Sequence, residues 1–180
     1  MFDYERYFNQ YRDENKLELN LSFVMPEGYE TACGTFDAEL KTVFINAEYL
    51  KKAPDYEKAF TLFHELRHAS QYLYPELFSS AIIRSLPYVI MYNGVCYKLI
   101  DGKYYACKLE GEEAYFSDIY LGQPYEIDAN QFAFEQVKKI CGDSESLRKL
   151  YEFRMPSQIV PDEVYDSIYT LIDEKIQMNA

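Results

Sequence analysis

The stretch that decides the fold reads AFTLFHELRHASQ and runs from Ala59 to Gln71. On a helical wheel one side of this segment is apolar, and that side holds Leu62, Leu66, Ala69 and Leu73. His64 and His68 fall on the opposite side, near Thr61 and Gln71. The segment therefore predicts a helix with one face in the core and a separate face that carries two imidazoles.

The two histidines and the acid beside the first form a His-Glu-x-x-His pattern. Neutral imidazole nitrogens bind zinc at about 2.0 to 2.1 Å, and a catalytic zinc keeps a position for water beside three protein ligands. Glu65 is then placed to take a proton from that water rather than to bind the metal. The pattern therefore predicts a Zn²⁺ site with His64 and His68 as ligands. The competing interpretation is a pair of surface histidines on an amphipathic helix, with no metal.

Length and composition predict a single packed domain. The chain has 180 residues, of which 48% are hydrophobic and 17% aromatic, enough for one core and too few for two. We predict one domain over residues 1–180, with a core at 19–141 and a helical extension at 143–180. The formal net charge of −12 disfavours nucleic acid and anionic membranes as partners.

Nothing in the apolar pattern predicts export or membrane insertion. The N-terminal residues are charged and lack the apolar segment of a signal peptide. The longest apolar stretch, near residues 81–91, contains Arg84 and Pro87 and is too short for a membrane span. We therefore expect a cytoplasmic protein with free thiols. That expectation includes Cys96 and Cys107, which a predicted hairpin sets opposite each other.

Helical and strand patterns are both present, and they predict an α+β fold. The predicted helices cover residues 3–15, 55–74, 124–141, 144–153 and 161–178. The predicted strands cover residues 19–25, 33–38, 42–46, 95–100 and 103–108. Residues 77–91 are predicted to be helical with an interruption at Pro87, and residues 110–121 to form a loop rich in acid and tyrosine.

A third zinc ligand must come from elsewhere in the chain, because there is no third histidine. Helix 124–141 offers two acids: the wheel puts Glu126 on the apolar face and Asp128 on the outward, charged face. A lone carboxylate on an apolar face costs several kcal/mol unless something pairs with it. We therefore predict Glu126 as the third ligand. A salt bridge from Glu126 to an arginine, or a thiolate ligand from Cys33 or Cys141, remains the alternative.

Asn130 lies one turn after Glu126 on the same predicted face. Histidines that bind a metal usually donate their other N–H to a nearby acceptor, which fixes the orientation of the ring. We predict that Asn130 accepts such a bond from a ligating histidine.

The pattern His-Glu-x-x-His at 64–68, followed by Glu-x-x-Ala-Asn-x-Phe-Ala at 126–133, resembles the gluzincin metallopeptidases. The resemblance is strongest to the small ImmA/IrrE-type or minimal gluzincin proteins of bacteria and phages. It implies a zincin-like fold, in which a small antiparallel or mixed sheet packs on the active-site helix and a second helix carries the glutamate. The resemblance also implies that one edge strand within Cys33–Asn46 lines the cleft. Two positions depart from the family: Arg67 stands where Gly is common, and Asn130 where many members have Asp.

These features together predict hydrolysis of peptide bonds in a peptide or protein substrate. Zinc would activate a water, and Glu65 would act as general base. The oxyanion formed in the reaction needs a donor besides the metal, and the candidates are Tyr72, Tyr88, Tyr115 and Tyr120. The alternative is a non-catalytic zinc-containing binding or regulatory protein with a gluzincin-like fold. Such a protein would tolerate loss of Glu65, so the presence of Glu65 favours the enzyme.

Overall fold

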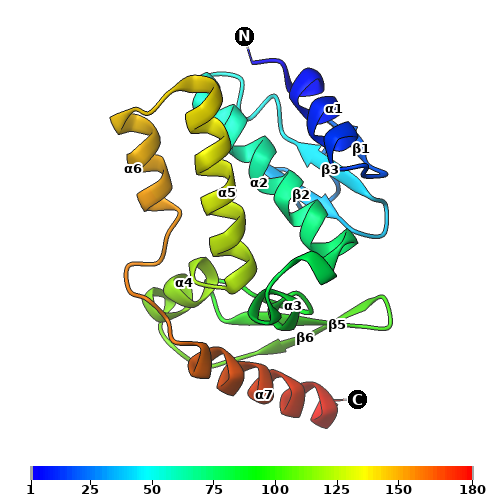
Figure 1. The fold of residues 1–180 in the computed structure, drawn as a ribbon. Helices are drawn as coiled ribbons and strands as arrows, with labels where there is room; N and C mark the ends of the chain where they lie inside the picture. The colour runs from blue at the N-terminus through cyan, green and yellow to red at the C-terminus, as the bar shows by residue number, and fades with distance from the viewer. Residues whose placement is uncertain (1, 180) are drawn as a thin grey trace. The chain divides into compact units, whose positions relative to one another are not determined.

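The computed structural model describes residues 2–179, which form an α+β fold with seven α-helices and two three-stranded sheets (Figure 1). In chain order the elements are α1 Tyr4–Glu14, β1 Asn20–Ser22, β2 Gly34–Asp37, β3 Thr42–Ile45, α2 Asp55–Leu73, the short 3₁₀ helix η1 Pro75–Leu77, α3 Ser80–Ser85, β4 Tyr88–Ile90, β5 Val95–Ile100, β6 Lys103–Lys108, α4 Glu113–Leu121, α5 Pro124–Cys141, α6 Glu145–Phe153 and α7 Asp162–Asn179. The predicted fold class is therefore confirmed.

The chain forms two compact units. The first contains the residues up to Leu77 together with Asp128–Glu152, and the second contains Phe78–Ile127 and the residues from Phe153 onward. Helix α5 is continuous through the boundary at Asp128. Of the two C-terminal helices, α6 lies in the first unit and α7 in the second.

The first unit is built on a mixed sheet with strand order β1-β3-β2. β3 lies in the centre, parallel to β1 and antiparallel to β2, so that β1 and β2 are the edges. All four residues of β3 are buried, as expected for a central strand that reads Thr-Val-Phe-Ile. Helix α2 packs against β2 and β3 (Figure 1). The family resemblance implied a small antiparallel or mixed sheet on this helix, and the sheet is mixed.

Helix α2 buries the face that the wheel selected. Leu62, Leu66 and Ala69 have no exposed surface, and they share a core with Val43 and Ile45 of β3. Helices α1, α5 and α6 add apolar side chains to the same core, among them Phe8, Tyr11, Ala133, Val137 and Leu147. The 3.6-residue periodicity of α2 therefore identified its inward side correctly.

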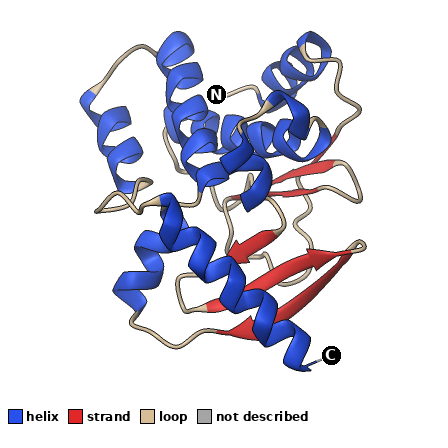
Figure 2. Ribbon diagram, turned by 60° about the horizontal axis from the view of Figure 1, so that its bottom comes forward, coloured by secondary structure: helices blue, strands red, loops and turns tan. Residues whose placement is uncertain are grey.

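The second unit contains the antiparallel sheet β4-β5-β6 and helix α7, which packs against β5 and β6 (Figure 2). The β5–β6 hairpin turns at Asp101 and Gly102, whose φ angles of 49° and 76° are those of a type I′ turn. Cys96 lies directly opposite Cys107, as predicted, and all four cysteines are free thiols. Burial raises the pKa of the Cys96 thiol to about 12.

Two local expectations were wrong. After Pro87 the chain forms strand β4 rather than a second piece of helix, because Tyr88–Ile90 pairs with β5. The expected loop at 110–121 contains helix α4, which buries Phe116 and Ile119 at helical spacing.

Among residues 2–179, no helix combines the length and the apolar character that a membrane crossing requires.

Leu62→Ala should lower the free energy of unfolding by about 2 to 5 kcal/mol, because it removes a fully buried side chain from the core under α2. Leu40→Ala is the matched control, since Leu40 is 59% exposed in the same unit, and it should cost less than about 0.5 kcal/mol. Urea denaturation followed by circular dichroism measures both. Equal losses in the two variants would contradict the inward orientation of Leu62.

Candidate metal centre

Helices α2 and α5 bring the three predicted ligands together. One ligand atom from each of His64, His68 and Glu126 lies within 4.8 Å of the other two. The two imidazole Nε2 atoms are 2.9 Å apart, and the rings are nearly perpendicular, at 87°. The two nitrogens therefore lie side by side, with a Glu126 carboxylate oxygen within 4.8 Å of a ligand atom of each histidine.

The residues present fit a metal ion. Two nitrogens bound to one tetrahedral ion at about 2.05 Å lie about 3.3 Å apart, so the observed Nε2–Nε2 distance of 2.9 Å needs only a small adjustment. His68 and Glu126 are buried, and Glu126 retains only 9% of its accessible surface. A carboxylate so far from water is favoured when a cation pairs with it. The group can therefore hold a metal ion.

Glu65, the predicted general base, lies under the edge strand β2. A Cβ atom added to Gly34 would come within 3.0 Å of both Glu65 Cγ and Thr61 Cγ2, and within 3.1 Å of the Phe44 carbonyl oxygen. Only glycine allows β2 and α2 to approach this closely. Edge strand β2 therefore packs directly against Glu65, and its role in lining a cleft stays a prediction.

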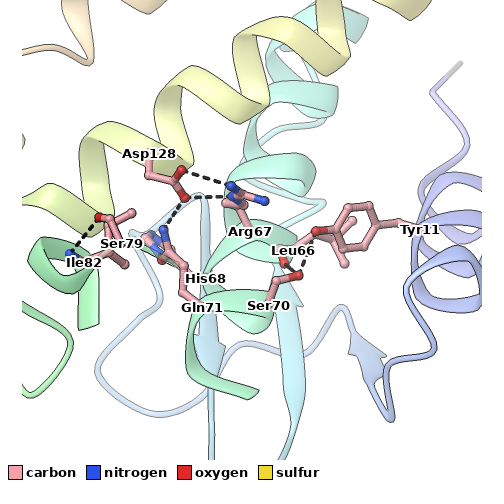
Figure 3. A network of polar contacts seen from close by, with 9 residues as sticks. All are labelled: Tyr11, Leu66, Arg67, His68, Ser70, Gln71, Ser79, Ile82 and Asp128. Carbon is pink, nitrogen blue, oxygen red and sulfur yellow. Dashed lines mark hydrogen bonds and ion pairs between the residues drawn. The ribbon is translucent and has the colours of Figure 1, made fainter. Parts of the chain in front are cut away.

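Asp128 holds α5 against α2, contrary to the expectation that it faces outward. Arg67 donates two hydrogen bonds to its carboxylate, from Nε to Oδ2 at 2.7 Å and from Nη2 to Oδ1 at 3.0 Å (Figure 3). The same guanidinium lies 4.8 Å from the ring centre of Phe132, one turn further along α5. The wheel grouped Asp128 with charged residues, but a single-helix wheel does not show that α2 places an arginine against that face.

Gln71 connects this ion pair to the metal centre, and the sequence reasoning did not give it a role. Its Oε1 is 2.8 Å from His68 Nδ1, and its Nε2 donates to Asp128 Oδ2 at 2.7 Å (Figure 3). Gln71 has no exposed surface. The available signal was the spacing of three residues after His68, which places both on one helix face. Asn130, the predicted orienting residue, is buried on α5, and its role stays a prediction.

Helix α1 reaches the same region through Tyr11, whose hydroxyl is 2.8 Å from Ser70 Oγ on α2 (Figure 3). Burial raises the pKa of Tyr11, so that its phenol stays neutral. Burial by itself would lower the pKa of Arg67, but the hydrogen bonds and charge of Asp128, together with Tyr11, outweigh burial and raise that pKa. The arginine therefore stays charged in its contact with Asp128.

The four candidate oxyanion donors differ in what surrounds them. The Tyr88 hydroxyl donates to Asp173, 3.1 Å from each carboxylate oxygen. The other three make ring contacts with neighbouring aromatic side chains, and they are Tyr72, Tyr115 and Tyr120. Their role in catalysis stays a prediction.

Comparison of the chain with models of protein families, with curated proteins and with solved structures finds no match. The functional conclusion therefore depends on the chemistry of this centre.

Gly34→Ala should lower the free energy of unfolding by about 1 to 3 kcal/mol, because the added methyl group meets a backbone carbonyl that cannot move away. Thr61→Ser removes one of the three atoms that the methyl group would contact. It keeps the hydroxyl, which donates to the Glu57 carbonyl. In the double variant the loss should be smaller than the sum of the two single losses. A Gly34→Ala protein as stable as the wild type would show that β2 and α2 are not in close contact.

Proposed function

We propose that this protein is a zinc-dependent metallopeptidase of the gluzincin type, which hydrolyses peptide bonds in a peptide or protein substrate. The observation that supports this most is the convergence of ligand atoms from His64, His68 and Glu126 within 4.8 Å, with Glu65 next to the first ligand in α2. The mixed sheet on α2 and the glutamate on α5 agree with a zincin-like arrangement.

Zinc is the metal that this donor set suits best. Two imidazole nitrogens and one carboxylate oxygen match the three protein ligands of many catalytic zinc sites, in which the fourth position is left for water or substrate. Magnesium and calcium prefer sites made of oxygen ligands only. When bound, zinc lowers the pKa of a coordinated water to about 7 and polarises a substrate carbonyl.

Glu65 supplies the proton transfers. Its carboxylate takes a proton from the attacking water and returns it to the amide nitrogen that leaves, which general acid–base catalysis requires in peptide hydrolysis. Glu65 is buried beneath Gly34, so the carboxylate is confined to a narrow range of positions. This confinement favours catalysis because a base acts only within hydrogen-bonding distance of the proton it removes.

The free edge of β2 is suited to hold the substrate. In the sheet, β2 hydrogen-bonds to β3 on one side only, so its other side can accept an extended peptide as an additional strand. Backbone hydrogen bonds give affinity that depends little on side chains. A substrate bound there would run beside Glu65, the residue over which Gly34 lies.

Wild-type protein purified without added metal should contain about one zinc ion per chain and should cleave members of an unstructured peptide library. Glu65→Gln should retain the zinc and lower kcat by about 10² to 10⁴-fold, because the amide cannot accept the proton. Glu57→Gln is the matched control, since Glu57 lies on the same helix, and it should leave both the zinc content and the rate unchanged. Plasma emission spectrometry and mass spectrometry of the products provide the two measurements.

Two results would contradict the proposal. Wild-type protein that contains no stoichiometric zinc at neutral pH would contradict the proposed zinc site. If zinc is stoichiometric but Glu65→Gln does not slow cleavage, the proposed peptidase activity is contradicted. A zinc-containing binding protein is then the better description.

A further inference from the structure

We propose that Gln71 and Asp128 are positioning residues, which fix the tautomer of His68 so that its Nε2 presents a lone pair to the metal. The inference rests on the proposed metal site and names residues of this chain that set its geometry.

Arg67 anchors the carboxylate of Asp128. An ionised carboxylate can only accept hydrogen bonds, and Arg67 donates to both of its oxygens, at 2.7 and 3.0 Å. Bidentate pairs of this kind hold a carboxylate in one orientation. The guanidinium is held in turn by the ring of Phe132, 4.8 Å away. Asp128 therefore presents Oδ2 to α2 in a defined position.

Asp128 in turn orients the side-chain amide of Gln71. The group that contacts Asp128 Oδ2 must be a donor, so it is the NH₂ group of Gln71, at 2.7 Å. The carbonyl oxygen of the same amide then faces His68, where Oε1 lies 2.8 Å from Nδ1. Exchanging the two ends of the amide would place the amide oxygen against a carboxylate oxygen of Asp128, where neither atom can donate. Asp128 thus decides which atom of Gln71 the histidine meets.

The Gln71 carbonyl oxygen then fixes the tautomer of His68. Because Gln71 Oε1 can only accept, Nδ1 of His68 must carry the hydrogen. In the neutral ring Nε2 is then unprotonated, and it lies 2.9 Å from Nε2 of His64. Without metal, His64 must supply the hydrogen between the two nitrogens. The apoprotein should therefore contain opposite tautomers, with His68 protonated at Nδ1 and His64 at Nε2.

Arg67 gains a role in this arrangement. It stands where gluzincins commonly have glycine, and in this chain it anchors the carboxylate that orients Gln71. Three of the four residues lie within about one turn of α2, at positions 67, 68 and 71, and only Asp128 comes from α5. The orientation of one metal ligand is thus set by the same contacts that join the two helices.

The tautomers can be measured directly in the metal-free protein, since the chain has only two histidines. Long-range ¹H–¹⁵N spectra of the imidazole nitrogens, recorded on apoprotein in alkaline buffer, should show one Nδ1–H ring and one Nε2–H ring. Gln71→Met should abolish the Nδ1–H preference of His68. Gln131→Met is the matched control, because Gln131 is exposed on α5, and it should leave both rings as in the wild type. An Nε2–H tautomer for His68 in the wild type would overturn the inference, and this result needs no variant to fold.

Zinc affinity, measured by competition with a chelator, tests whether Asp128 acts through Gln71. Gln71→Met should weaken zinc binding about 10 to 100-fold, and Asp128→Asn should also weaken it. In the Gln71→Met background, Asp128→Asn should have no further effect. Additive losses would show that Asp128 acts on the metal by its own charge, and they would overturn the proposed connection.

The test of the His68 tautomer is independent of the test of peptidase activity. Predicted tautomers and affinities in a protein that cleaves no peptide would contradict the hydrolysis and support the role of Gln71 and Asp128. Cleavage that depends on Glu65, with the wrong His68 tautomer, would do the opposite.

Discussion

The bidentate ion pair between Arg67 and Asp128 is the interaction on which the site depends. It joins α2, which carries two imidazoles, to α5, which carries Glu126 two residues before Asp128. The charges are partly shielded from water, so removing either partner would leave the other poorly solvated. Asp128 Oδ2 also accepts a hydrogen bond from Gln71, whose Oε1 contacts Nδ1 of His68. The pair therefore contributes to the geometry of a centre that it does not itself enter.

Close approach of the backbone is the second constraint. Strand β2 can pack against Glu65 only because residue 34 has no side chain. This contact brings a free strand edge to the carboxylate proposed as general base, so that one glycine serves both the packing of the sheet and the shape of the site. The polar chain from Arg67 to His68 lies on the same helix as Glu65, and α2 is therefore the element that unites both constraints.

The sequence pattern predicted the structure correctly wherever the residues that determine it lie within one helix or one hairpin. The core face of α2 followed from its periodicity, and the β5–β6 pairing from an Asp-Gly turn that allows only one register. The sequence pattern predicted the wrong secondary structure where contacts with distant parts of the chain determine it. The tripeptide of β4 is a strand because β5 pairs with it, and α4 is a helix because two apolar residues in an acidic segment reach a core.

The sequence by itself determined the donor set of the candidate centre. With two histidines in the chain and one inward-facing acid on a second helix, His64, His68 and Glu126 were the natural choice, and their ligand atoms do converge. Only the tertiary structure decided how that set is held. Asp128 was assigned to solvent because a wheel describes one helix alone, whereas its environment depends on what the neighbouring helix presents. Gln71 joins Asp128 to His68 across 57 residues of sequence, and a contact of that range depends on how two helices pack.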